Sequence, residues 1–67
     1  MNTDQVLILA RKHLGNGAAM ESSARLCLED AVLHTAMGDL DSAKKRAIDS
    51  LRYSVGVFHK DYIKAAA

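Results

Sequence analysis

The residue types best suited to chemistry lie together in the middle of the chain, between residues 27 and 34. Cys27, Asp30 and His34 are three and four residues apart, so a helix would place them on one face. A thiolate, a carboxylate and an imidazole are all ligands of zinc. No second motif supplies a fourth ligand, however, and a core cysteine beside a surface Asp–His pair gives the same spacing. The sequence therefore predicts no metal site.

His34 also lies in a segment that resembles the phosphate-accepting helix of histidine phosphotransfer domains. In "LHTAMGDL", residues 33–40, a His-Thr pair precedes a glycine, as it does in that family. Those domains are four-helix bundles longer than this chain, and they carry a lysine where this chain has Ala36 and Met37. A motif outside its structural context supports an activity only weakly. Phosphotransfer by His34 is therefore an alternative hypothesis, as is metal binding.

Positive charge is concentrated at Lys44, Lys45 and Arg46, with Arg52 further along the same segment. Such residues could contact phosphates, and two helices joined at a glycine also occur in helix-turn-helix proteins. Aspartates at positions 39, 41 and 49 offset much of this charge, and the net charge of the chain is only +1. The segment has no Asn or Gln to read base edges. A solvated helix face is favoured, and a nucleic-acid-associated regulator that uses this basic face is the alternative.

The sequence shows neither a catalytic constellation nor a phosphate-binding loop. The adjacent carboxylates of Glu29 and Asp30 would point in different directions on a helix, and no serine has a base at a readable spacing. The glycines at positions 15 and 17 lack the lysine that phosphate-binding loops use. We therefore predict that the protein is not an enzyme, with no catalytic residue, no cofactor-binding residue and no cofactor.

The chain is short, with 67 residues and a single cysteine. A domain of this size buries only about 60% of the surface that its unfolded chain exposes, and such domains usually need a disulfide, a metal or a partner. One cysteine excludes an intrachain disulfide and fits a reducing compartment. The longest apolar run, residues 6–10, is far below the roughly 20 residues of a membrane-spanning helix. We expect a cytoplasmic protein without a secretory signal or a membrane segment, stabilised by a protein partner.

Apolar residues recur at helical spacing in three segments of the chain. The first predicted helix covers about residues 3–15, with Asn2 as its cap and Gln5 three residues later, as in a weakened capping box. The second covers about residues 18–37 and carries two apolar stripes. A helix with two apolar stripes should contact neighbours on two sides, so we expect it to form the centre of the fold.

The third predicted helix begins after Gly38, with Asp39 or Asp41 as its cap. Gly56 falls inside its apolar pattern, and a glycine within a helix costs about 1 kcal/mol relative to alanine. Helical spacing nevertheless continues on both sides of this glycine, at Val55, Phe58, Tyr62 and Ile63. We therefore expect the helix to continue through Gly56, with a kinked or broken C-terminal helix as the alternative.

The second and third helices are joined by a very short corner, "MGDLDSA" at residues 37–43. A connector of two to four residues forces two helices to pack antiparallel. The segment "GDLDSA" followed by a regular helix resembles the middle of a tetratricopeptide repeat. The small residues typical of that family have counterparts here at Ala31, Ala43 and Ser50. The resemblance implies two antiparallel helices meeting at the glycine.

The resemblance covers about 30 residues, from 24 to 54, and a single unit. Cys27, Asp30 and His34 replace an aromatic residue, a leucine and a tyrosine that are common in the family, and the usual closing proline is absent. Because repeat arrays need about three units to be stable, the resemblance implies one hairpin and not an array. By analogy it implies a protein-binding role.

Together these patterns predict one all-α domain over residues 1–67, a small antiparallel three-helix bundle in which a helical hairpin packs against an N-terminal helix. Its apolar content exceeds what so small a core would cover. We therefore expect a small non-catalytic protein–protein interaction module that self-associates or binds a larger protein. The residues expected at this contact are large and apolar or aromatic: Met20, Leu26, Leu33, Met37, Phe58 and Tyr62.

Overall fold

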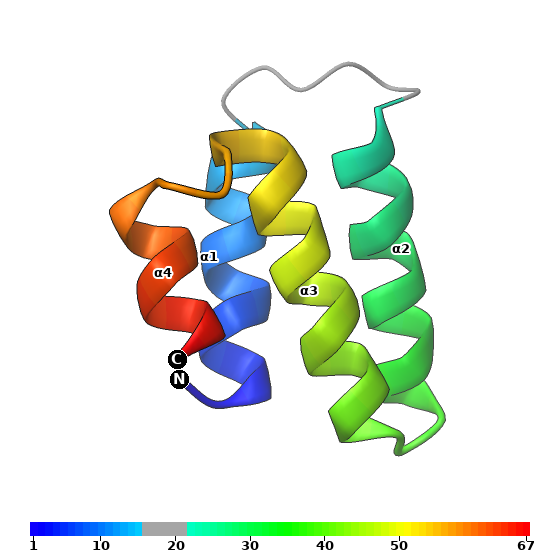
Figure 1. The fold of residues 1–67 in the computed structure, drawn as a ribbon. Helices are drawn as coiled ribbons and strands as arrows, with labels where there is room; N and C mark the ends of the chain where they lie inside the picture. The colour runs from blue at the N-terminus through cyan, green and yellow to red at the C-terminus, as the bar shows by residue number, and fades with distance from the viewer. Residues whose placement is uncertain (16–21) are drawn as a thin grey trace.

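The computed structural model describes residues 1–15 and 22–67. Within these residues the chain forms no strand and four helices: α1 (Thr3–Gly15), α2 (Ser23–Ala36), α3 (Leu40–Val55) and α4 (Lys60–Ala66). Helices α2 and α3 form an antiparallel hairpin, and α1 packs against α3 (Figure 1). The predicted all-α bundle of a helical hairpin and an N-terminal helix is confirmed. None of the described helices has the length and apolar character needed to cross a bilayer.

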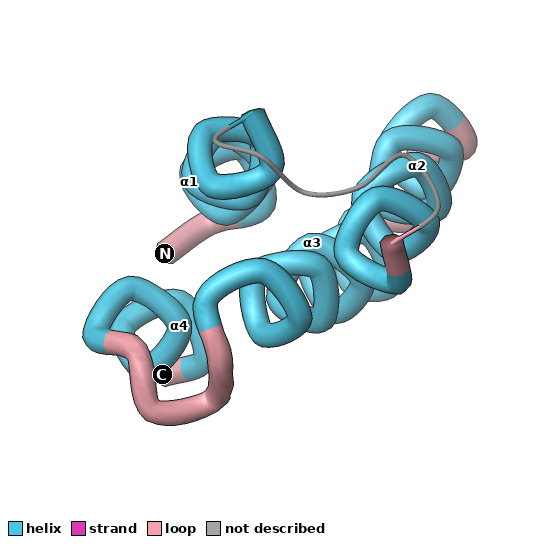
Figure 2. The backbone as a smooth tube through the Cα atoms, turned by 90° about the horizontal axis from the view of Figure 1, so that it is seen from above, coloured by secondary structure: helices cyan, strands magenta, loops and turns pink. Residues whose placement is uncertain are grey.

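The helix at the centre of the bundle is α3, and the prediction that the second helix would take this place is wrong. Seen from above, α3 runs between α2 on one side and α1 and α4 on the other (Figure 2). Its buried residues are Ala43, Ala47, Ser50 and Leu51, and three of these four are small. Small side chains let neighbouring helix axes approach closely. A single helix can therefore contact the other three.

The start of α1 has the predicted capping box. The Gln5 backbone N–H donates to Asn2 Oδ1 at 2.9 Å, and the Asn2 N–H donates to Gln5 Oε1 at 2.9 Å. Thr3 Oγ1 donates to the carbonyl oxygen of Leu40 at 3.2 Å, which connects the first turns of α1 and α3. One face of α1 then enters the core, through Val6, Leu7 and Ala10.

Helix α2 begins later than the apolar pattern predicted. Ser22 has an extended backbone, and its hydroxyl accepts a hydrogen bond from the Arg25 N–H at 3.2 Å. Ser22 is therefore the N-cap, because a serine in this conformation satisfies an amide that the first helical turn leaves unpaired. The predicted start near Ala18 lies outside the described residues.

The corner between α2 and α3 is built around Gly38, whose φ is +81°. The amides of Gly38 and Asp39 donate to carbonyl oxygens in the last turn of α2, at 3.1 and 3.0 Å. Asp39 then caps α3 by accepting from the Ser42 N–H at 3.2 Å. Further along the hairpin, buried Ser50 donates its hydroxyl to the Ala24 carbonyl at 2.6 Å. The sequence left open whether Asp39 or Asp41 caps this helix, and the structure shows that Asp39 does.

The expectation that the third helix continues through Gly56 is wrong. Helix α3 ends at Val55, and Gly56 has a φ of +88°. Glycine takes this left-handed conformation without the steric cost that a Cβ imposes, so the chain can leave the helix here. After a short loop, α4 returns to the bundle and buries Ala65 in the core beside residues of α1, α2 and α3.

Candidate functional site

An apolar stripe runs along the outward face of α2, and we call its residues, Leu26, Leu33 and Met37, the α2 stripe. Their spacing of seven and four residues places them on one helical face. They are 58%, 57% and 64% exposed. The opposite face of α2, which carries Ala24, Leu28 and Ala31, is buried. Helix α2 therefore has one apolar face in the bundle and a second one in solvent.

Charged residues border the α2 stripe and are paired within the chain. The Asp30 carboxylate lies 2.9 Å from Arg46 Nε and 3.5 Å from His34 Nε2. Arg25 Nε donates to Glu29 Oε1 at 3.1 Å on the same helix. Asp30 lies on the same face, between Leu26 and Leu33, and these contacts pair its carboxylate with Arg46 of α3 and His34 of α2.

The six residues predicted for a partner contact do not form one surface. Phe58, in the loop between α3 and α4, is 90% exposed, whereas Tyr62 of α4 is partly buried against the core. Both views place α4 and α2 on opposite sides of α3 (Figures 1 and 2). Met20 lies outside the described residues. The structure therefore places Leu26, Leu33 and Met37 on one face of α2. Phe58 and Tyr62 lie on the other side of α3.

The structure does not gather Cys27, Asp30 and His34 into a three-ligand group. His34 instead has its two ring nitrogens 3.5 Å from an Asp30 oxygen and 3.6 Å from an Asp39 oxygen. Cys27 is partly buried, and its pKa is raised chiefly by this burial and further by the negative charge of Asp49. A raised pKa keeps the thiol protonated and poorly suited to metal binding or nucleophilic attack.

The basic face of α3 is partly neutralised by its neighbours. Arg46 lies 2.9 Å from Asp30 and 3.8 Å from Asp49, measured between side-chain nitrogen and oxygen atoms. The Arg52 guanidinium stacks over the ring of Tyr53, with 4.7 Å between its carbon and the ring centre. A phosphate approaching this face would compete with contacts that two of the four cations already make.

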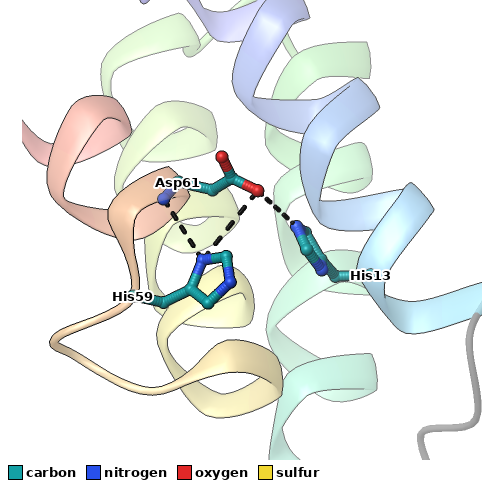
Figure 3. A group of neighbouring side chains, drawn as sticks. All are labelled: His13, His59 and Asp61. Atoms are coloured by element: carbon teal, nitrogen blue, oxygen red, sulfur yellow. Dashed lines mark hydrogen bonds and ion pairs between the residues drawn. The ribbon is translucent and has the colours of Figure 1, made fainter.

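A group of three possible metal ligands lies at the other end of the structure, and the sequence did not predict it. The group consists of His13, His59 and Asp61, and each places one ligand atom within 4.8 Å of the other two. Among residues 1–15 and 22–67 it is the one group of this kind. His13 Nε2 donates to Asp61 Oδ2 at 2.9 Å, and His59 Nδ1 lies 3.9 Å from the same oxygen (Figure 3). All three side chains are partly buried.

Two helix ends position this group, which we call the His–Asp cluster. His13 lies in the last turn of α1, and His59 is the N-cap of α4, with its Nδ1 accepting from the Asp61 N–H at 3.2 Å. The two imidazole rings meet edge to face, with 5.5 Å between their centres. The hydrogen bond from His13 lowers the pKa of Asp61, so Asp61 is ionised at neutral pH.

The chain matches no model of a known protein family, no curated protein sequence and no solved structure. Its function is therefore inferred from the two features that the fold places at its surface. One is the α2 stripe, which periodicity predicted in part. The other is the His–Asp cluster, which depends on the chain turning at Gly56.

Proposed function

We propose that the protein is a small non-catalytic interaction module that self-associates, and that α2 of a second copy covers the α2 stripe. The observation that carries this proposal is the exposure of three large apolar side chains on one face of a helix whose opposite face is already buried. Burying a leucine or methionine side chain fully is worth about 1.5–3 kcal/mol, and more than half of each side chain is still exposed. Covering the stripe is therefore favourable.

The spacing of the stripe supports an antiparallel pairing of two α2 helices. Leu26, Asp30, Leu33 and Met37 follow one another at four, three and four residues, as do the inward positions of a helix pair. When two such helices pair antiparallel, Leu26 of one copy comes level with Met37 of the other. Asp30 then comes level with Leu33 of the second copy, and Glu29 comes level with His34. A two-fold axis thus matches the apolar ends of the stripe with each other and the Glu29 carboxylate with the His34 imidazole.

The size of the stripe indicates a weak, reversible dimer. Helix α2 has 14 residues and is therefore about 21 Å long at 1.5 Å per residue. A contact along one such helix falls at the small end of specific interfaces, where transient complexes are found. Mutual burial would also supply the additional stability that a chain of this length needs. A protein-binding role is in line with the resemblance to a tetratricopeptide-repeat hairpin.

The alternatives have less support from the geometry. His34 lies beside the carboxylates of Asp30 and Asp39, and these negative charges would repel a phosphoryl donor. For nucleic acid, the basic side chains of Arg46 and Arg52 already contact other groups. Self-association needs neither a rearrangement of these pairs nor an additional ligand.

Sedimentation velocity over a wide concentration range tests the proposal. We expect the natural chain to pass reversibly from monomer to dimer. Leu33→Asp should remain monomeric, because it removes the apolar side chain opposite Asp30 and places two carboxylates level with each other in the pair. Ile8→Asp is the matched control, since Ile8 is 66% exposed on α1, and it should dimerise like the natural chain. Circular dichroism must show equal helix content in all three. A natural chain that stays monomeric, or an undiminished dimer of Leu33→Asp, would contradict the proposal.

A further inference from the structure

The His–Asp cluster joins segments that are far apart in the chain, at a point where the fold has few other cross-links. His13 and Asp61 are 48 residues apart, and α4, which begins at the cluster, has only seven residues. We propose that His13, His59 and Asp61 form a binding site for a divalent transition-metal ion of the zinc class. This proposal concerns α1 and α4 and is independent of the α2 stripe.

The separations between the ligand atoms suit such an ion. Zinc binds imidazole nitrogen and carboxylate oxygen at about 2.0–2.1 Å, so two ligands of a tetrahedral site lie roughly 3.3 Å apart. The two separations to Asp61 Oδ2 are 2.9 Å from His13 Nε2 and 3.9 Å from His59 Nδ1. They lie on either side of the ideal value, by about half an ångström each. The ligand atoms of the two imidazoles lie within 4.8 Å of each other, so side-chain rotations that bring them together would complete the geometry.

The ligand types select the class of ion. Two imidazoles and one carboxylate suit zinc, cobalt and nickel, whereas magnesium and calcium prefer sites made of oxygen atoms. Three protein ligands leave a fourth position for water. The side chains are only partly buried, so an ion can reach the site from solvent.

The protonation states that the cluster already has are close to those that an ion needs. His59 Nδ1 accepts a hydrogen bond from the Asp61 N–H, so this nitrogen carries a lone pair and no proton. His13 Nε2 donates to Asp61, and binding a metal through this nitrogen requires its proton to move to Nδ1, the other tautomer of a neutral imidazole. The ion then replaces the His13–Asp61 hydrogen bond and the hydrogen bond from the Asp61 N–H to His59 Nδ1.

A bound ion would act as a cross-link between the two ends of the chain. It would hold the last turn of α1 to the first turn of α4 and thereby keep Ala65 in the core. Small domains commonly gain stability from a disulfide or a structural metal. Because this chain has one cysteine, a metal is the cross-link that remains available within one copy.

Three variants separate metal binding from the other roles of these side chains. His59→Asn keeps an oxygen acceptor for the Asp61 N–H, since asparagine is among the best N-cap residues, but it removes an imidazole ligand. His13→Gln keeps a side-chain N–H that can donate to Asp61 and also removes a ligand. His34→Gln is the control, because His34 is the chain's remaining histidine and lies outside the cluster.

The experiment uses the full chain, freed of metal with a chelator and then titrated with zinc sulfate. Calorimetry should give one ion per chain, and Tm should rise by on the order of 10 °C at a hundredfold excess over Kd. Cobalt added in place of zinc should show the strong visible absorption of a tetrahedral site. Natural chain and His34→Gln should behave alike. In His59→Asn and His13→Gln the affinity should fall at least about tenfold, although both fold without metal.

Several results would overturn the proposal. One is a natural chain whose Tm does not respond to zinc and which shows no cobalt spectrum. Another is equal zinc affinity in the natural chain, His59→Asn and His13→Gln, or loss of binding in His34→Gln alone. A stoichiometry of one ion per two chains would also overturn it, because the ion would then be shared between copies.

Discussion

Two glycine corners, at Gly38 and Gly56, turn the chain in similar ways and lead to different results. Both glycines have a positive φ, +81° and +88°, and both end a helix. At Gly38 the next helix starts almost at once and packs along the whole of the previous one. At Gly56 a loop intervenes, and the short α4 returns beside α1 (Figure 1). The first corner builds the core of the hairpin, whereas the second brings His59 and Asp61 to His13.

The comparison shows that the packing around a corner, more than its backbone conformation, decides what the corner contributes. Along the hairpin that Gly38 closes, the buried residues Ala31, Ala43 and Ser50 let α2 and α3 pack closely. Beside Gly56, Val57 and Phe58 are exposed. The contact that fixes the second corner is polar and made through the His–Asp cluster. We therefore expect the first region to respond mainly to changes in side-chain volume and the second to changes in charge and metal.

The largest expected effect comes from overpacking the hairpin. Ala43 and Ala65 are both fully buried, but Ala43 lies between two long helices and Ala65 on the short α4. Ala43→Leu should lower the free energy of unfolding by about 1–3 kcal/mol, a typical cost of overpacking. Ala65→Leu should cost less, because α4 can shift. Exposed Ala36→Leu is the control, and urea unfolding measures all three. Equal costs at Ala43 and Ala65 would refute the difference in rigidity.

A smaller effect is expected at the two glycines themselves. An added Cβ would meet no atom within 4 Å at either Gly38 or Gly56, so the cost of a substitution comes from the backbone. Valine at a positive φ should cost roughly 1–2 kcal/mol at each corner. At Gly38 asparagine should cost less, because it tolerates a left-handed conformation at a helix end better. At Gly56, where ψ is 154°, asparagine should cost about as much as valine, because this region of backbone conformation is essentially restricted to glycine. Thermal unfolding of the four single variants tests this expectation, and equal effects of Val and Asn at Gly38 would argue against the observed turn.

The smallest expected effect is a dependence of stability on acid pH at both corners. Hydrogen bonds from Ser42 lower the pKa of Asp39, and the hydrogen bond from His13 lowers that of Asp61, relative to the ordinary value of 3.8. A lowered pKa in the folded state means that each carboxylate stabilises the fold above pH 3.8, and that this contribution is lost as the pH falls through the lowered pKa.

Asp39→Asn and Asp61→Asn measure these two contributions separately. Each variant should lose less Tm than the natural chain between about pH 5 and pH 2. Asp39→Asn should also keep most of its stability at neutral pH, because asparagine caps helices well. Unchanged slopes of Tm against pH in both variants would show that other groups carry the acid sensitivity.

Much of the fold could be predicted because its signals are local. The reciprocal bonds of Asn2 and Gln5, the turn at Gly38 and the antiparallel hairpin all follow from residues a few positions apart. The expectation that the helix continues through Gly56 was wrong because it relied on the helical spacing of Phe58 and Tyr62 beyond the glycine. Phe58 is in fact exposed. Spacing alone does not show which apolar residues are buried.

The candidate sites could be predicted only in part for related reasons. Periodicity placed Leu26, Leu33 and Met37 on one face of the second helix, but which face would meet α3 depended on the tertiary packing. The His–Asp cluster had no sequence signal that could be read alone. His13 and His59 are 46 positions apart, and a helix continuing through Gly56 would have carried His59 away from α1.

The most direct test of the central claim, that α2 of a second copy covers the α2 stripe, is disulfide cross-linking between two singly substituted chains. Both chains carry Cys27→Ser to remove the natural thiol, one carries Leu26→Cys and the other Met37→Cys. An antiparallel pair brings residue 26 level with residue 37, so mixed oxidation should give mainly the 26–37 product. Products that link each chain to its own kind, or no cross-linking above that of an Ile8→Cys control, would contradict the account.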